Sequence, residues 1–206
     1  MLRGEELQRH ILFIAKDVFL ELGFERTSMD AIAARAGTTK RTLYAHFANK
    51  EQLFLAIIDL VERLLGEKLR NPEDYADDPV ESLVLFCGRF QRILVWGPAV
   101  RLCRRFTAEA ENFPEGAARA YDALFGTVES RVAEFLSTRL GQSRDRAVQI
   151  TEQLMSRLFH PRILRALFGI DPIVDDWEDE AAVDPAFDPA PIRRFIAQAV
   201  AHPTGD

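Results

Sequence analysis

Apolar residues recur every three to four positions along almost the whole chain, which is the spacing of one face of an α-helix. In the first such stretch Gly23 ends an apolar face made of Leu7, Ile11, Ile14, Ala15, Val18, Phe19 and Leu22. Further helices are expected at about 53–69, 80–95, 99–110, 116–140, 144–168 and 192–201. No run of alternating β-branched residues is long enough to require a strand. The pattern therefore predicts an all-α protein.

Residues 24–53 are punctuated more closely and read FERTSMDAIAARAGTTKRTLYAHFANKEQL. Thr27, followed three residues later by Asp30, is a capping-box pattern that predicts the start of a short helix. Gly37 can adopt the left-handed backbone of a tight turn. A second short helix is expected at about 39–47, with its apolar residues toward the core. Two short helices around such a turn predict a helix-turn-helix, whose second helix enters the DNA major groove.

The outward face of this second helix combines hydroxyls, cations and flat rings, from Thr39, Lys40, Arg41, Thr42, Tyr44 and His46. Hydroxyl groups can bind phosphates or bases, and arginine can bind guanine through two hydrogen bonds. An ordinary solvated helix face could have the same composition. The position just after a capped helix and a glycine turn favours DNA binding.

A third helix is expected to start at Asn49, a good N-cap residue, with Gln52 in the position of its capping partner. Lys50 then lies in the first helical turn, where a cation opposes the helix dipole. A DNA phosphate resting on the helix N-terminus would remove this conflict. We favour that interpretation over chance placement.

The string G-F-x-x-T-S-x-x-x-I-A-x-x-A-G-x-T-K-x-T-L-Y-x-H-F-x-N-K-E-x-L, over residues 23–53, resembles the DNA-binding signature of the TetR family. The resemblance implies an all-helical homodimer, usually a repressor, that releases operator DNA when a small molecule fills a pocket in its C-terminal domain. It also implies contacts, mainly to phosphates, from Thr27, Ser28, Thr39, Lys40, Tyr44, His46 and Lys50.

By the same resemblance, Arg41 and Thr42 lie closest to base edges. The sequence departs from the family pattern at Thr38, which replaces a usual apolar residue and which we count with the DNA-binding residues. Arg41 replaces a commonly small residue and could add a base contact of its own. We call the N-terminal DNA-binding part, residues 1–54, the head. Beyond it, residues 101–121 and 167–171 are similar to the C-terminal domain of an AefR-like branch of the family.

Charge is divided unevenly along the 206 residues. The net charge of −6 argues against a nucleic-acid partner when taken as a whole. Residues 1–54, however, hold eight Lys or Arg against seven Asp or Glu, so that the remaining chain carries −7. Such a distribution orients the head toward a polyanion. We predict an N-terminal three-helix DNA-binding domain over 1–54 and a larger helical effector-binding and dimerisation domain over 55–206.

Ten of the fifteen phenylalanines follow residue 54. If a pocket exists there, its apolar lining favours a small hydrophobic or aromatic effector over a sugar or a nucleotide. The alternative is that these residues simply form the core. The expected lining, beside the helix that starts at Asn49, is Leu64, Phe86, Phe90, Trp96, Cys103, Phe106, Phe125 and Phe159.

The last two helical stretches carry apolar faces with no obvious partner inside the chain. Two copies of each would form a four-helix dimer interface. A two-fold homodimer presents two recognition helices, which matches a palindromic operator in double-stranded DNA. The expected interface residues are Leu154, Leu158, Ile163, Leu167, Phe168, Ile192, Phe195, Ile196 and Ala199.

Other chemistry finds little support in the sequence. Cys87 and Cys103 make no disulfide framework, and neither they nor His160 have metal-ligand spacing, so we expect no metal, no cofactor and a cytoplasmic protein. Cys103 is either a redox-sensing thiol among arginines or an inert buried one. Apolar runs are interrupted by charges well short of a membrane span. No phosphate loop, nucleophile elbow or histidine–carboxylate cluster predicts an enzyme.

Two alternatives to a ligand-responsive repressor remain. One is an enzyme whose N-terminal helices merely resemble the motif, and turnover of a small molecule would support it. The other is an interaction protein in which residues 55–206 only dimerise the head. The absence of a cavity in residues 55–206 would support that alternative. The acidic segment 171–188, with eight Asp or Glu and no Lys or Arg, is either a solvated loop or a partner-binding segment.

Overall fold

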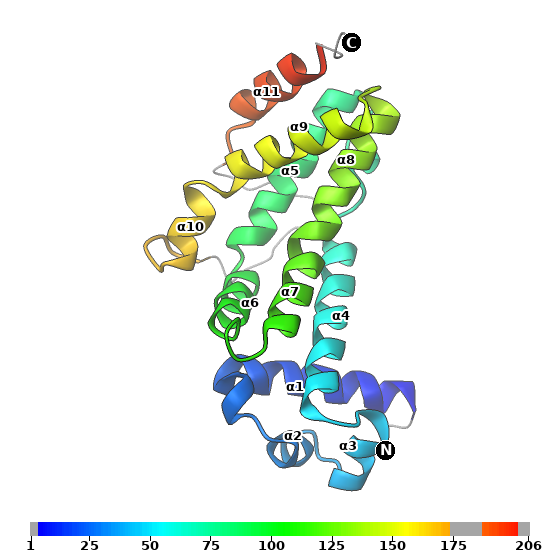
Figure 1. Cartoon of the computed structure of the whole chain (residues 1–206), viewed down its shortest axis with the longest axis vertical. Helices are drawn as coiled ribbons and strands as arrows, with labels where there is room; N and C mark the ends of the chain where they lie inside the picture. The colour runs from blue at the N-terminus through cyan, green and yellow to red at the C-terminus, as the bar shows by residue number, and fades with distance from the viewer. Residues whose placement is uncertain (1–3, 174–186, 202–206) are drawn as a thin grey trace. The chain divides into compact units, whose positions relative to one another are not determined.

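A computed structural model describes residues 4–173 and 187–201, and within these ranges the regular elements are helical (Figure 1). The predicted all-α class is confirmed. None of the described helices is long and apolar enough to cross a membrane. In chain order the elements are α1 (Glu5–Arg26), α2 (Met29–Arg35), α3 (Lys40–His46), α4 (Lys50–Lys68), η1 (Pro72–Asp74), α5 (Pro79–Val95), α6 (Gly97–Ala108), α7 (Pro114–Tyr121), η2 (Asp122–Gly126), α8 (Thr127–Arg139), α9 (Arg144–Phe159), α10 (Arg162–Leu167) and α11 (Pro189–Ala201).

The chain divides into two compact units. The first comprises Met1–Leu65 and Arg101–Leu124, and the second comprises Gly66–Val100 and Phe125–Asp206. The division points fall inside α4, α6 and η2 and do not coincide with residue 54. The assignment of DNA binding to 1–54 and of effector binding and dimerisation to 55–206 therefore stays a functional prediction.

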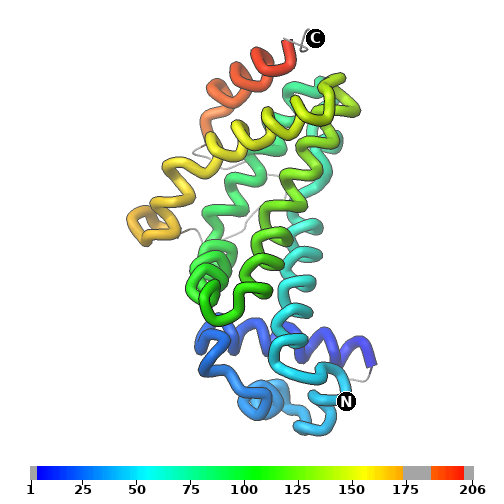
Figure 2. Tube along the Cα trace, in the orientation of Figure 1, coloured from blue at the N-terminus to red at the C-terminus, as the bar shows by residue number. Residues whose placement is uncertain are grey.

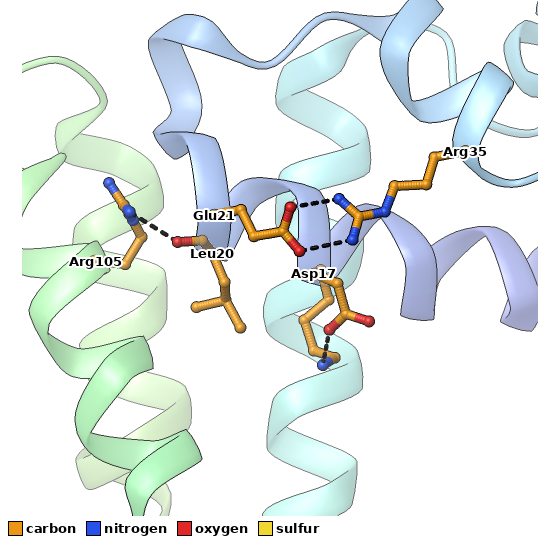
Figure 3. Close-up of polar contacts among 6 residues, drawn as sticks. Asp17, Leu20, Glu21, Arg35 and Arg105 are labelled. Carbon is orange, nitrogen blue, oxygen red and sulfur yellow. Dashed lines mark hydrogen bonds and ion pairs between the residues drawn. The ribbon is translucent and has the colours of Figure 1, made fainter.

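The first unit is built around the apolar faces of α1 and α4. Ile11, Phe19, Leu53 and Phe54 are buried there, and the rings of Phe19 and Phe54 meet edge to face with centroids 5.1 Å apart. The helix α2 packs against both α1 and α3. An exposed ion pair between Glu21 and Arg35 adds a polar link from α1 to α2, shown in Figure 3.

The second unit is held together mainly by α5, α8, α9 and α11. The helix α8 packs along α9, and α11 packs on α5 and α9 (Figure 2). Phe86 and Phe90 on α5 are fully buried in this core. The side chain of Arg89 is also buried, and its Nε donates to the Lys68 carbonyl at 3.1 Å. This hydrogen bond offsets part of the cost of burying a cation.

Three expected boundaries need correction. The stretch 144–168 is two helices, because Pro161 lacks an amide hydrogen and cannot continue the helix. Residues 116–140 form α7 and α8, with a π-helical turn between them. The helix α2 is capped by Ser28 rather than Thr27. Most of the acidic segment, residues 174–186, lies outside the described residues.

Candidate nucleic-acid interface

The turn between α2 and α3 is defined by backbone hydrogen bonds at the end of α2. Gly37 has φ 63°, and its N–H donates to the Ala34 carbonyl at 3.2 Å. The Thr38 N–H donates to the Ala33 carbonyl at 3.0 Å. These two bonds and the left-handed glycine make a Schellman motif, which ends a helix and redirects the chain sharply. The predicted glycine turn is confirmed.

Side-chain caps fix the starts of the three helices α2, α3 and α4. The Ser28 hydroxyl accepts from the Ala31 N–H at 3.1 Å at the start of α2. Thr39 caps α3 in the same way, with the Thr42 N–H donating at 3.1 Å. Asn49 Oδ1 accepts from the Gln52 N–H at 2.8 Å, which confirms the expected start of α4. Such caps typically stabilise a helix by about 1 kcal/mol each.

The helix α3 presents a polar face to solvent. Its apolar anchors, Leu43 and the following Phe47, are buried. Lys40, Arg41 and Tyr44 are exposed, as are Ser28 and Thr39 at the helix starts, while Thr38, Thr42 and His46 are half-buried. The predicted set of side chains is therefore gathered around one short helix, with the exceptions of Thr27 and Lys50.

Lys40 forms an ion pair with Asp30 on α2, at 2.8 Å between Nζ and Oδ1. This hydrogen bond raises the pKa of Lys40. Both side chains are more than half exposed, and surface pairs of this kind contribute little free energy. The ammonium can therefore exchange Asp30 for a phosphate at small cost.

Thr27 does not lie on this exposed face. Its side chain is 2% exposed, and its hydroxyl donates to the Gly23 carbonyl at 2.6 Å. The expected DNA contact from this side chain is thus corrected: the hydroxyl is used to close the end of α1. The neighbouring Ser28 is the exposed hydroxyl at this position.

Lys50 occupies the first position of α4, as predicted, but it already has a partner there. Its Nζ donates to the Phe24 carbonyl at 2.9 Å and lies 4.3 Å from the centroid of the Phe24 ring. These contacts explain a cation at a helix N-terminus without any DNA. An ammonium has three donor hydrogens, so a phosphate contact by Lys50 stays a prediction.

Comparison with known proteins agrees with this geometry. Residues 11–57 match the model of bacterial regulatory proteins of the tetR family, and residues 81–189 match the C-terminal domain of AefR-like transcriptional repressors. An HTH-type transcriptional repressor of Mycobacterium tuberculosis is 30% identical over 84% of this chain and 82% of its own length. The chain belongs to the TetR family.

Other relatives match a smaller part of this chain. The AcrR regulator of Shigella flexneri is 36% identical over 39% of this chain and 38% of its own length. The FasR activator of Mycolicibacterium smegmatis is 41% identical over 27% of this chain and 28% of its own length. Among solved structures, the flavonoid-responsive regulator FrrA superposes with a TM-score of 0.72 at 26% identity, covering 96% of this chain and 95% of its own. A Mesorhizobium loti regulator at 22% identity has a TM-score of 0.64, covering 98% and 96%, and shows the shared fold.

TetR-family proteins are transcriptional regulators and not enzymes, often repressors, and they usually dimerise. For this member the DNA contacts of the individual residues stay predictions. Among the residues that the structure describes, no group of three His, Cys, Asp or Glu could hold a metal ion.

The residues predicted to line an effector pocket are divided between the two units. Leu64, Cys103 and Phe106 belong to the first, and the others belong to the second. Phe106 is buried and meets Phe54 edge to face at 5.6 Å. Burial raises the pKa of the Cys103 thiol to about 11, which favours the inert alternative over a redox sensor. The Cys87 pKa is also raised by burial.

In the second unit the predicted pocket residues differ in exposure. Phe86 and Phe90 fill the core, whereas Trp96, Phe125 and Phe159 are partly exposed. The rings of Phe125 and Phe159 meet edge to face at 5.1 Å. A groove of about 670 Å³ between α8 and α9 is lined by none of the predicted residues, but by Gly126, Glu129, Ser130, Ala133, Glu134, Ser137, Arg144, Val148, Thr151 and Glu152.

The premise behind the predicted dimer interface is wrong. The apolar faces of α9 and α11 do have partners inside the chain, because α11 packs on α5 and α9. Most of the predicted interface residues are consequently buried within one chain: Leu154, Leu158, Ile163, Ile192, Ile196 and Ala199. Leu167 and Phe195 are partly exposed, and for them the interface role stays a prediction. Phe168, also expected at the interface, is 81% exposed, and Leu164 and Ile170 near it in the sequence are exposed as well, as is Val148 on α9.

Proposed function

We propose that this TetR-family regulator is a ligand-responsive repressor that binds a palindromic operator as a homodimer and leaves it when a small hydrophobic effector binds. The observation that carries the proposal is the frame of α2, the Gly37 turn and α3, which is capped at both helix starts and exposes Lys40, Arg41 and Tyr44. A protein with this task works beside the chromosome, so we place it in the cytoplasm.

In this proposal the exposed face of α3 lies in the major groove. Arg41 binds the edge of a guanine, and Thr42 lies next to it. Ser28, Thr39, Tyr44 and His46 bind phosphates and fix the register of the head on the duplex. Lys40 leaves Asp30 for a phosphate, and the weakness of an exposed ion pair supports this exchange.

The direction of regulation is proposed from relatives. The Mycobacterium tuberculosis protein that aligns with most of this chain is a repressor, whereas the FasR relative, which aligns with 27% of this chain, is an activator. We therefore favour repression. A reporter gene placed behind the operator should be more active when the regulator is deleted, and lower activity on deletion would establish an activator instead.

The effector that we propose is a planar aromatic compound. FrrA, which superposes over nearly the whole chain, is flavonoid-responsive. Partly exposed aromatic side chains of the second unit can contact such a ring, and Trp96 also lies 5.2 Å from the Lys68 ammonium. Calorimetry with a flavonoid, with and without saturating operator, tests this. The two affinities must differ if the compound is the inducer, because coupling between two ligands is reciprocal.

The dimer surface that we propose includes the exposed apolar residues Leu164, Phe168 and Ile170. Exposed groups of this size usually mark a contact surface. The occupant is a second copy of the chain, because a palindromic site needs two heads related by a two-fold axis. Sedimentation of the full chain at micromolar concentration without DNA should show a dimer.

The decisive experiment is selection of bound duplexes from a random DNA pool with the full-length protein. We expect an inverted repeat whose half-sites are about one or more helical turns apart. The Arg41→Ala variant is the control, and its selected sites should lose preference at one base position in each half. Recovery of no common sequence from the pool would contradict the proposal.

A further inference from the structure

The helix α1 is broken near its end, and residues near the end of α6 supply the partners that the break removes. Gly23 has φ 82° and ψ 170° inside α1. In a continuous helix the Phe24 N–H would donate to the Leu20 carbonyl, four residues earlier. Here the Phe24 N–H donates to Glu109 Oε1 at 2.8 Å. Arg105 Nη2 donates to the Leu20 carbonyl at 2.7 Å, as Figure 3 shows. We call this arrangement of Arg105 and Glu109 on the end of α1 the α1 clamp.

Glu109 is an unusual residue to find in this place. It is 6% exposed, and Asn112 Nδ2 donates to its second oxygen at 3.4 Å. A buried carboxylate is costly unless it accepts hydrogen bonds. The bond from the Phe24 N–H therefore stabilises both groups, and neither can leave the other without leaving a buried group unsatisfied.

The backbone at Gly23 is fitted to the clamp. A Cβ atom added there would lie 2.9 Å from Glu109 Oε1 and 3.0 Å from Arg105 Nη1. The positive φ already disfavours any other residue. A side chain at position 23 would thus have to displace both clamp residues and also strain the backbone.

The clamped segment touches the elements on either side of the recognition helix. The Phe24 carbonyl and ring hold Lys50 at the start of α4. The Phe24 ring stacks on Phe113, with centroids 5.0 Å apart. Just before the break, Glu21 pairs with Arg35, the last residue of α2. A shift of the α1 end would therefore also move its contacts with α2 and with the N-terminus of α4.

We propose that Arg105 and Glu109 are positioning residues for DNA binding. They contact no DNA themselves. By replacing the broken helical bond of α1, they fix the end of α1, against which α2 packs and whose Phe24 holds Lys50 at the start of α4. They thereby keep α2 and α4 in the arrangement that presents α3. A head that is ordered before it meets DNA loses less conformational entropy on binding. This proposal rests on the proposed DNA-binding function of the head.

The test is operator affinity of full-length variants. Glu109→Ala should lower it about tenfold, because a buried N–H is left without its acceptor. Glu109→Gln keeps an acceptor oxygen and should recover most of the affinity. Gly23→Ala, which leaves both clamp residues in the chain but displaces them, should resemble Glu109→Ala. The matched control is Glu111→Ala, which removes the same charge two residues away at an exposed site.

Two further readouts separate positioning from a lost contact or an unfolded chain. The salt dependence of binding should be unchanged in Glu109→Ala, because no phosphate contact is removed. Hydrogen exchange of the Phe24 amide should become at least about tenfold faster in this variant and stay normal in Glu111→Ala. Faster exchange together with wild-type operator affinity would overturn the proposal. If Arg41→Ala also binds like the wild type, the proposed DNA interface fails rather than the clamp.

Discussion

Residue patterns predicted a DNA-binding surface in residues 24–53 and a dimer interface in the helices α9 to α11. The structure agrees with the first pattern better than with the second. In the first region Lys40, Arg41 and Tyr44 are exposed on one short helix, α3. In the second, most of the apolar residues expected to face a second copy are buried within one chain. The difference lies in what each pattern specifies.

A cap, a left-handed glycine and a buried i, i+4 pair together fix the direction in which a short helix points its other side chains. An apolar helix face specifies that it will be covered, and it says nothing about what covers it. The partners of α11 are α9 and α5, and α5 ends 94 residues before α11 begins. Local patterns contain no information about such a contact.

The largest expected effect is on the unfolding free energy, when an arginine replaces a buried residue of α9. Leu158 is 1% exposed, so Leu158→Arg buries an unpaired charge and should destabilise the fold by about 4 kcal/mol or more. Phe168, at 81% exposure, is the matched site, and Phe168→Arg should change the unfolding free energy of the monomer by less than about 0.5 kcal/mol. Urea denaturation of both variants measures this.

The same two variants address assembly. Phe168→Arg should shift the folded protein from dimer toward monomer in sedimentation, because it places a charge in the proposed contact surface. If the Leu158→Arg variant remains folded and becomes monomeric, Leu158 lies in the dimer interface after all, as the sequence predicted. The contrast between the two regions would then be wrong.

A second prediction concerns the recognition face itself. Arg41→Ala should cost about 1–3 kcal/mol in discrimination at one base position and leave the other positions unchanged. Binding to a set of operators with single base changes measures it, with Lys40→Ala as the control that should weaken all of them alike. Equal losses at every position for Arg41→Ala would make Arg41 a phosphate contact.

Much of the fold could be predicted because the helices are amphipathic and their ends carry caps and prolines. The DNA-binding site could be located because Gly37, Thr39 and Asn49 act locally. Thr27 was assigned wrongly because its hydroxyl bonds back to Gly23, a contact that depends on where α1 ends. Gly23 was identified as a helix end, but its close approach to Arg105 and Glu109, more than eighty residues later, leaves no local signal.

Lys50 offers a third prediction, of moderate size. Lys50→Ala should reduce the slope of log affinity against log salt by about one, because one phosphate contact is lost. It should also cost about 1 kcal/mol of stability, since the Phe24 carbonyl loses one of its two donors and keeps only the Thr27 N–H. Lys68→Ala, at the other end of α4, removes the same charge and should leave the slope unchanged. A stability loss with an unaltered slope would confine Lys50 to its contacts with Phe24.

The smallest effect is expected at the exposed pair of Glu21 and Arg35. The hydrogen bond from Arg35 lowers the pKa of Glu21, so the folded chain releases this proton more readily than the unfolded one. The pair therefore contributes stability above the usual glutamate pKa of 4.5, and this contribution is lost as pH falls through the lowered value. Urea unfolding of Glu21→Gln and wild type should differ slightly at pH 7 and converge toward pH 3. A difference that persists at pH 3 would show that Glu21 acts through packing and not through its charge, and the link from the α1 end to α2 would then not be electrostatic.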